Sequence, residues 1–277
     1  MRVTKKIGEN VAGKRVFITG ATSGIGKACA QLFAAAGCEV IGVARHVPAK
    51  EKETVRGGSI RYIKMDVTKP EDIEAVFRDM PRIDIAVLCA GMGVAGAIAE
   101  MPMTLVREQM EVNFFGVVGV CDKVLCNMHK AGGGSIVIIG SVAGKVAIPM
   151  QGYYSASKYA LEAYADALRI EEKCNNIRVS IVEPGDTKTG FTKNRKIYTC
   201  EGSEYEERVN RAVGKMERDE QNGSPAKNVA KLVFRVAGMQ NPPPRVAVGF
   251  VYRMVTFVLK VLPERTRERC IEKMYLS

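Results

Sequence analysis

Tyr154 and Lys158 are the residues whose types and spacing most directly suggest chemistry. They stand four positions apart in the segment YYSASKYALEAYADALRIE, so on a helix they share one face. A phenol can give or take a proton, and a nearby ammonium ion favours its ionised form, since the pKa of free tyrosine is about 10. With 9 Tyr and 21 Lys among 277 residues, a tyrosine followed by a lysine at this spacing arises by chance about 0.7 times. The pair alone therefore does not identify a catalytic site, and the neighbouring residues must be considered.

Ser141 adds a hydroxyl donor. It follows the β-branched run at 135–140 and precedes Tyr154 by 13 residues. The carboxyl ends of parallel strands are where open α/β sheets bind ligands. A hydroxyl there can donate to a substrate oxygen and stabilise its developing charge. The three side chains therefore predict proton transfer to or from a carbonyl or alcohol oxygen.

A glycine-rich turn supplies a candidate dinucleotide site. The strand expected at 15–19 runs into the turn Gly20-Ala-Thr22-Ser23-Gly24-Ile25-Gly26 and then into a helix. Gly20 allows the tight turn, Gly24 lets the backbone approach a pyrophosphate, and Gly26 lets helix and strand pack closely while the helix N-terminus faces the anion. The alternative is a glycine-rich corner that binds no ligand.

Arg45 bears on the choice of dinucleotide. The second expected strand ends in GVAR, so no carboxylate stands where one would hold the free 2′-hydroxyl of NAD(H). A guanidinium can instead pair with a 2′-phosphate. The sequence therefore favours NADP(H) over NAD(H), with a solvated loop arginine as the alternative.

Strand and helix patterns alternate along the first 185 residues. Apolar strand candidates lie at 15–20, 39–45, 60–66, 84–91, 135–141 and 177–185, and helical patterns at 26–36, 70–79, 104–129 and 153–174. This alternation predicts an α/β fold: one doubly wound, Rossmann-type parallel sheet with helices on both faces. Because no linker interrupts it, residues 1–277 are expected to form a single dinucleotide-binding oxidoreductase domain.

The combined motifs resemble the short-chain dehydrogenase/reductase family over roughly 14–190. They are TGATSGIG, LCAG in the place of NNAG, Asn113, Ser141, YSASK and the PG of VEPGDTKTG. The resemblance implies that Tyr154 is the proton donor or acceptor, and that Lys158 holds the nicotinamide ribose and lowers the tyrosine pKa. It also implies that Ser141 orients the carbonyl and that Asn113 supports a water relay.

The same resemblance implies further cofactor contacts. Asp66 and Val67 resemble the pair that contacts adenine, although Asp66 also suits a helix N-terminus ahead of Pro70. The motif at 88–91 adds Cys89, Ala90 and Gly91, with Cys89 replacing the usual Asn and its sheet-stabilising hydrogen bonds. The segment that closes over the nicotinamide corresponds to Pro184, Gly185, Thr187 and Thr189, for which an ordinary turn is the alternative.

The expected reaction is hydride transfer between a nicotinamide and a carbonyl or secondary alcohol of an apolar, steroid-like or lipid-like substrate. Residues 149–171 loosely resemble hydroxysteroid dehydrogenases. A 3-oxoacyl thioester reductase is an alternative, and a non-catalytic nucleotide-sensing interaction protein is an alternative of another class. The family resemblance also implies a homodimer or homotetramer through the helices at 104–129 and 153–174.

The last third of the chain carries the candidate substrate elements. Residues 188–223 are polar and predict a substrate lid, 226–238 a helix, 245–248 a last strand and 249–277 a hydrophobic, basic helical tail. Residues 249–263, GFVYRMVTFVLKVLP, are mostly large and apolar, and Arg253 and Lys260 are their only basic residues. Three interpretations compete: first a core or dimer helix, then a lining for an apolar substrate, and last a helix lying on anionic lipid.

Composition excludes several other classes. The formal net charge is +11, but no basic run alternates with aromatic residues, so nucleic-acid binding is not expected. Eight cysteines without a C-x-x-C pair, and only two histidines, support neither a metal site nor a disulfide framework. With no signal-peptide pattern and no apolar run of 18 residues, we expect a cytoplasmic protein, with peripheral membrane contact through the tail as its one route to a bilayer.

Overall fold

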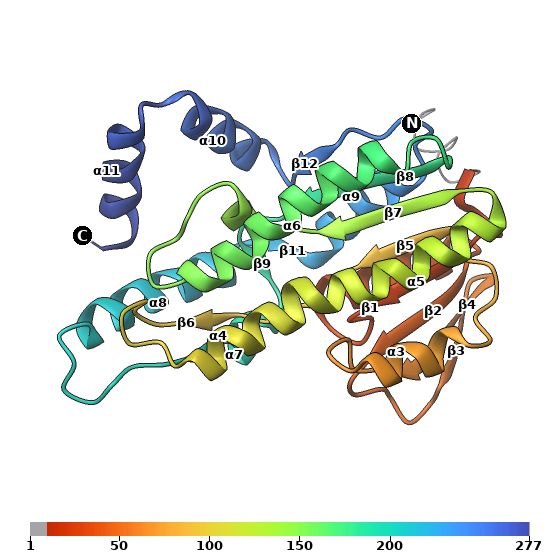
Figure 1. Cartoon of the computed structure of the whole chain (residues 1–277), viewed down its shortest axis with the longest axis horizontal. Coiled ribbons are helices and arrows are strands. Elements are labelled where there is room, and N and C mark those ends of the chain that lie inside the picture. Colours follow the sequence, from red (N-terminus) through yellow and green to blue (C-terminus); the bar gives the residue numbers. More distant parts are fainter. Residues whose placement is uncertain (1–9, 277) are drawn as a thin grey trace.

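An eight-stranded sheet forms the centre of the structure, a computed structural model that describes residues 10–276 (Figure 1). The strand order is β12-β8-β7-β5-β1-β2-β4-β3, and every pair is parallel except β3 with β4. The bounds are β1 Arg15–Thr19, β2 Glu39–Ala44, β3 Lys52–Val55, β4 Gly58–Lys64, β5 Ile85–Leu88, β7 Gly134–Ile139, β8 Ile177–Glu183 and β12 Arg245–Ala247. The doubly wound sheet expected from the sequence is confirmed.

The edge strand β3 was not expected from the sequence. Its residues, KETV, are polar and half-exposed, so they lack the apolar pattern that marks the other strands. The strand pairs with β4 through a tight turn at Arg56 and Gly57, whose φ angles of 36° and 94° are both left-handed. Turns of this hand match the twist of antiparallel strands.

Helices cover both faces of the sheet. The helices α2 (Gly24–Ala35) and α9 (Ala226–Ala237) pack on one face, where Phe33 and Val233 are fully buried. The opposite face is covered by α3 (Pro70–Phe77), α5 (Gly116–Ala131) and α6 (Gly152–Glu171), as Figure 1 shows for α5 and α6. Apolar side chains of both layers bury the sheet and fix the ends of its strands relative to each other.

The helix expected at 104–129 is interrupted. It consists of α4 (Met103–Met110), a five-residue π-helix at Glu111–Phe115, and α5. Asn113 lies in the centre of the π-helix and is fully buried. Such widened turns are uncommon and are frequently found at functional sites.

The segment at 188–223 folds into short elements beside the sheet. They are β9 (Thr187–Lys188), α7 (Phe191–Asn194), β10 (Lys196–Ile197) and α8 (Glu206–Gln221), followed by β11 (Ser224–Pro225). Two small parallel pairs hold them: β10 pairs with β6 (Val94–Ala95), and β11 pairs with β9. Four residues of α8, Val209, Ala212, Val213 and Met216, are buried.

The tail forms two helices separated at Pro263, α10 (Phe250–Val261) and α11 (Glu264–Tyr275). None of their described residues is buried, so the interpretation of the tail as a core helix of this chain is wrong. The helices project from the body after β12, and only one side of them faces it (Figure 1). Within residues 10–276, no helix combines the length and apolar character needed to cross a membrane.

Candidate active site

A cavity of about 700 Å³ opens at the carboxyl ends of the parallel strands. The segments that follow β1, β2, β4, β5, β7 and β8 all contribute to its wall. Every candidate residue from the sequence except Asn113 lines it: Gly20, Thr22, Ser23, Gly24, Ile25, Gly26, Arg45, Asp66, Val67, Cys89, Ala90, Gly91, Ser141, Tyr154, Lys158, Pro184, Gly185, Thr187 and Thr189.

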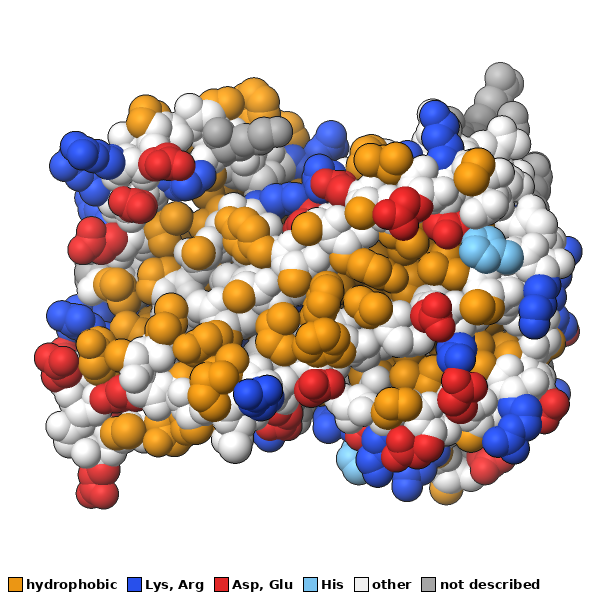
Figure 2. Space-filling view, in the orientation of Figure 1, with side chains coloured by type: hydrophobic (Ala, Val, Ile, Leu, Met, Phe, Trp, Pro, Cys, Tyr) orange, Lys and Arg blue, Asp and Glu red, His pale blue; other side chains and the backbone are white. Residues whose placement is uncertain are grey.

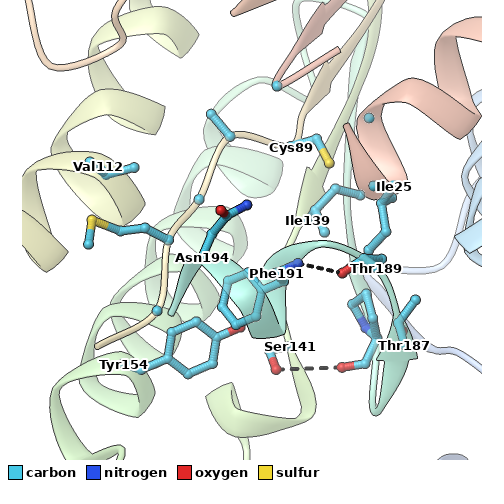
Figure 3. A pocket seen from close by; sticks show the side chains of 18 of the residues that line it. Ile25, Cys89, Val112, Ile139, Ser141, Tyr154, Thr187, Thr189, Phe191 and Asn194 are labelled. Carbon is cyan, nitrogen blue, oxygen red and sulfur yellow. Dashed lines mark hydrogen bonds between the residues drawn. The ribbon is translucent and has the colours of Figure 1, made fainter. Parts of the chain in front are cut away.

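Tyr154 and Ser141 lie side by side at the wall of this cavity (Figure 3). Ser141 ends the turn after β7, where its hydroxyl accepts from the Ala143 N–H at 3.1 Å and reaches the Pro184 carbonyl at 3.5 Å. Lys158 follows Tyr154 by one turn of α6, with its Nζ 5.8 Å from the centre of the tyrosine ring. The Lys158 ammonium donates to the Ile139 carbonyl at 3.0 Å.

Burial dominates the protonation of both groups. It raises the pKa of Tyr154 to about 12, against a hydrogen bond with Ser141 that acts in the opposite direction. It lowers the pKa of Lys158 to about 8, although the nearby Cys89 and Glu162 act to raise it. Glu220 acts to raise the Tyr154 pKa, and Arg195 acts to lower it. The effect of Lys158 on the tyrosine pKa, which the family resemblance implied, remains a prediction.

Asn113 stands behind the cavity wall rather than on it. Its amide oxygen accepts from the Met92 N–H at 2.8 Å, and its amide nitrogen donates to the Met92 carbonyl at 3.0 Å and to Ser157 Oγ at 3.1 Å. The three hydrogen bonds of this side chain therefore fix the segment after β5 to α6. A Cβ built on Gly91 would lie 3.4 Å from the Asn113 oxygen and 3.9 Å from Lys158 Nζ, so Gly91 separates the amide from the ammonium ion.

The glycine turn has the tight geometry expected of it. Gly20 and Gly24 adopt φ angles of 66° and 49°, which disfavour residues with a side chain. A Cβ on Gly26 would lie only 2.2 Å from the Gly20 carbonyl oxygen. The backbone can therefore approach itself this closely only because position 26 has no side chain. The first turn of α2 faces the cavity.

Arg45 and Asp66 lie at the end of the cavity beyond β2 and β4. Burial alone would raise the pKa of Asp66, but hydrogen bonds from Thr68 and the charges of Arg45 and Lys69 lower it. The carboxylate accepts from the Thr68 N–H at 3.0 Å and from its hydroxyl at 2.8 Å. Asp66 thus organises the turn before α3, while the Arg45 side chain is exposed at the cavity rim.

The replacement of Asn by Cys89 is compensated within the sheet. The hydroxyl of Thr19, at the end of β1, accepts from the N–H groups of both Cys89 and Ala90, at 2.8 and 2.9 Å. Burial raises the pKa of the Cys89 thiol to about 12, so the sulfur stays protonated. The neighbouring strand thus satisfies the first two backbone donors after β5 without an amide side chain.

The segment after β8 crosses the glycine turn. A Cβ on Gly24 would lie 3.4 Å from the Thr189 Cβ. The Thr189 hydroxyl accepts from the Phe191 N–H at 3.1 Å, which places the Phe191 ring 5.7 Å from the Tyr154 ring (Figure 3). Thr187 donates to the Gly185 carbonyl at 2.9 Å. These residues therefore lie between the glycine turn and Tyr154.

Sequence reasoning missed several residues of the wall. Tyr252 of α10 and Tyr275 of α11 line the cavity from the tail. Gln151, three residues before Tyr154, is 5% exposed, and its amide nitrogen has no hydrogen-bond partner among the described residues. In the lid segment Arg195 forms a buried ion pair with Glu220, and Phe191 faces Tyr154. Only Gln151 had a sequence signal, its place one turn before Tyr154.

Known proteins resemble this chain in sequence and in fold. A family model described as short chain dehydrogenase matches residues 14–197. The chain is 38% identical over 240 residues to 3-ketodihydrosphingosine reductase of Bacteroides thetaiotaomicron, covering 84% of this chain and 87% of the relative. It is 31% identical over 260 residues to dehydrogenase/reductase SDR family member 7B of Mus musculus, covering 90% and 77%.

A solved short-chain dehydrogenase of Streptomyces avermitilis has a similar structure. It matches with a TM-score of 0.76 at 27% identity, over 94% of this chain and 95% of that one. The likeness thus extends beyond the motifs to the arrangement of the whole sheet. The chain belongs to the short-chain dehydrogenase/reductase family and is an oxidoreductase that acts on carbonyl and alcohol groups.

Proposed function

We propose that this protein uses NADPH to reduce the ketone of a long-chain, apolar substrate. The observation that carries the proposal is the position of the Tyr154 hydroxyl beside Ser141 in the cavity at the carboxyl ends of the strands. A phenol with a pKa of about 12 holds its proton at neutral pH, which suits donation in the reductive direction.

The cavity fits a dinucleotide on the evidence of its backbone. Gly20, Gly24 and Gly26 leave a concave turn at the N-terminus of α2, which suits a pyrophosphate. Asp66 and Val67 border the site proposed for the adenine, and Arg45 at the rim suits a 2′-phosphate. Pro184, Thr187 and Thr189 border the proposed nicotinamide end. When bound, the nicotinamide supplies the hydride.

The protein's own part in the reaction is to manage one proton and one developing charge. Ser141 donates a hydrogen bond to the substrate carbonyl oxygen and orients it towards Tyr154. As the carbonyl carbon accepts a hydride and its oxygen gains negative charge, Tyr154 transfers its phenolic proton to that oxygen, which completes the alcohol and leaves a tyrosinate. The Lys158 ammonium stabilises this negative charge and binds the nicotinamide ribose, while Asn113 keeps the segment after β5 in place.

The lining of the cavity supports an apolar substrate with a small polar group. The segments around Tyr154 contribute apolar side chains to the wall, Met92, Val112, Ile148, Phe191 and Met216, beside polar ones such as Gln151 and Asn194. The Gln151 amide provides a buried donor without a partner among the described residues, which suits an oxygen close to the reacting carbon. The relative named 3-ketodihydrosphingosine reductase supports a long-chain amino ketone as the substrate class.

We further propose that two copies associate through α4, α5 and α6. Large apolar side chains on these helices and on the π-helix between α4 and α5 are exposed: Met103 at 59%, Phe115 at 53% and Ile170 at 76%. Figure 2 shows hydrophobic atoms spread over the face that these helices form. A patch of this kind is typical of a contact between protein subunits.

A substrate panel tests the proposal. The oxidation of NADPH and NADH is followed with 3-ketodihydrosphingosine, a ketosteroid, a 3-oxoacyl thioester and a short ketone. We expect kcat/KM to be highest for the long-chain amino ketone with NADPH. A preference for the steroid or the thioester would replace the substrate class, and the absence of turnover with every ketone, despite NADPH binding, would favour a nucleotide-sensing role.

A further inference from the structure

The outer face of α10 is a continuous apolar stripe exposed to solvent. Six large side chains form it, at positions 250, 251, 254, 257, 258 and 261, a spacing that places them on one side of a helix. They are between 42% and 76% exposed, with Val258 lowest and Phe250 highest. Figure 2 shows hydrophobic side chains at the upper edge of the molecule, over α10.

The exposure does not result from a loosely attached arm. At its start, α10 is fixed by Tyr252, whose hydroxyl bonds to Asp186, and whose ring lies so close to Gly185 that a Cβ there would be 2.3 Å from it. At the end of the second tail helix, α11, Tyr275 packs near Lys215 of α8, with 5.9 Å between the ammonium and the ring centre. The inner side of α10 therefore faces the body, and the apolar stripe faces away.

Basic side chains accompany the stripe. A second cavity of about 650 Å³ lies between α9, β12, α10 and α11, lined by Arg235, Arg253 and Arg267 together with apolar groups such as Leu259. Lys145 and Arg245 line it too, but both are paired with its carboxylate, Glu183. Neither Arg235 nor Arg253 forms a salt bridge with a carboxylate among residues 10–276, and Arg267 reaches only Glu264 at 4.0 Å. Three guanidinium groups at the edge of an apolar helix suit phosphate groups.

We propose that α10 lies in the surface of a membrane that contains anionic phospholipids. The stripe enters the outer acyl-chain region, and Arg235, Arg253 and Arg267 bind lipid phosphates. A helix of 12 residues is about 18 Å long, which suits a position in the plane of the membrane rather than across it. Charge complementarity favours an anionic membrane over a second copy of the chain as the partner of this face. In a contact between two copies, the arginines beside one α10 would meet the same arginines of the other and repel them.

The position of α10 brings the membrane next to the catalytic cavity. Tyr252 and Tyr275, which attach the tail to the body, also line that cavity. An apolar molecule that leaves the bilayer beside α10 would therefore enter the cavity without crossing bulk water. The membrane proposal itself does not rest on the proposed reaction, because its test measures binding and needs no turnover.

Vesicle co-sedimentation of the full chain tests this proposal. The vesicles consist of phosphatidylcholine alone or with about 30 mol% phosphatidylglycerol. We expect the wild type to bind the anionic vesicles at low salt, more weakly by about tenfold or more at high salt, and to bind the neutral ones poorly. The double variant F250S/F257S should bind anionic vesicles more than tenfold more weakly, because it removes two apolar rings whose transfer from water into the membrane favours binding.

Matched controls separate lipid binding from misfolding. Ile197 on β10 is 49% exposed, comparable to Met254 of the stripe at 46%, and lies outside the tail and the proposed contact between copies, so I197S should bind vesicles like the wild type. R235Q/R253Q should lose preference for anionic vesicles, whereas R78Q, an exposed arginine on the other side of the sheet, should keep it. Unchanged NADPH affinity and unfolding temperature would show that each variant folds.

Two results would overturn the proposal. One is a wild type that fails to sediment with anionic vesicles at low salt. The other is a wild type that forms an oligomer without lipid and does not bind vesicles, together with an F250S/F257S variant in which that oligomer dissociates. This result would identify the stripe as a contact between copies. Inactivity towards every ketone together with normal vesicle binding would refute the proposed function and leave the membrane site intact.

Discussion

The hydroxyl of Tyr252 donates a hydrogen bond to the side-chain carboxylate of Asp186 and accepts one, 3.0 Å long, from the backbone N–H of the same residue. The two residues are 66 positions apart. Since Asp186 follows the Pro184-Gly185 turn after β8, this double contact attaches the first turn of α10 to the cavity wall. The tail is therefore part of the catalytic cavity, although none of it belongs to the core.

Replacing Tyr252 with Phe tests this attachment. The ring that lies over Gly185 stays, but both hydrogen bonds to Asp186 are lost, so the free energy of unfolding should fall by about 1–2 kcal/mol. KM for a long-chain ketone should rise several-fold with little change in kcat. Urea unfolding and steady-state kinetics measure the two effects, with Y159F on the exposed side of α6 as the control. Equal stability of Y252F and Y159F would contradict the prediction.

Replacing Tyr154 with Phe removes the proposed proton donor and keeps the ring that packs on Phe191. We expect kcat to fall about 10²- to 10⁴-fold, while NADPH affinity changes only a few-fold. Fluorescence titration of NADPH and ketone reduction assays measure the two quantities. The adjacent variant Y153F is the control and should keep most of its activity. If Y154F were as active as Y153F, the catalytic role of Tyr154 would have to be abandoned.

Replacing Arg45 with Ala tests the choice of cofactor. A charge-assisted bond to a 2′-phosphate contributes about 1.5–3 kcal/mol, so KM for NADPH should rise about tenfold to a hundredfold, and KM for NADH should stay unchanged. R61A, an exposed arginine on β4, is the control. Wild-type protein that uses both cofactors equally well, or an Arg45 variant with unchanged selectivity, would argue against NADP(H).

The pH dependence should report Lys158. Burial lowers its pKa to about 8, so the ammonium charge is present below pH 8 and is lost as the pH rises through that value. The pKa of Tyr154, about 12, is too high to cause a decline there. We expect kcat/KM for NADPH, which follows the free enzyme, to fall above about pH 8. In K158R the guanidinium stays charged, so the residual activity should not decline there; a persisting decline would point to another group.

Replacing Thr19 with Val tests whether the Thr19 hydroxyl stabilises the end of β5, where Cys89 replaces the usual Asn. Valine keeps the shape but leaves the N–H groups of Cys89 and Ala90 without their acceptor, and Thr19 is only 2% exposed. The free energy of unfolding should fall by about 2–4 kcal/mol. C89A, which removes the thiol and keeps both hydrogen bonds, should cost clearly less. Comparable losses in the two variants would mean that the thiol contributes as much as the hydroxyl.

Much of the fold could be predicted because parallel strands buried on both faces carry unbroken apolar runs. The runs at 135–140 and 177–183 became β7 and β8, and the glycine turn followed from the backbone geometry that it requires. The strand β3 was missed since an exposed edge strand needs no apolar residues. The π-helix around Asn113 was missed because its cause, the bonds to the Met92 backbone, is a tertiary contact.

The tail shows the limit of pattern reading most clearly. Its apolar residues indicated burial, yet hydropathy does not say whether protein or another phase covers a helix. Likewise, the place of Tyr252 in the cavity depends on a contact with Asp186 that no spacing rule foretells. The residues that belong to motifs were thus identified from the sequence, whereas the residues of the tail and lid segment that reach the cavity only through tertiary contacts were not.

Thr189 has one more consequence, which concerns the order of events in turnover. Because this residue lies directly over Gly24, the segment after β8 covers the turn proposed to hold the pyrophosphate. We therefore expect spent cofactor to leave only after that segment lifts. Product formation should show a rapid first turnover followed by a slower steady state, and added viscosity should slow the second phase. Good ketones of different sizes would then share one upper limit on kcat.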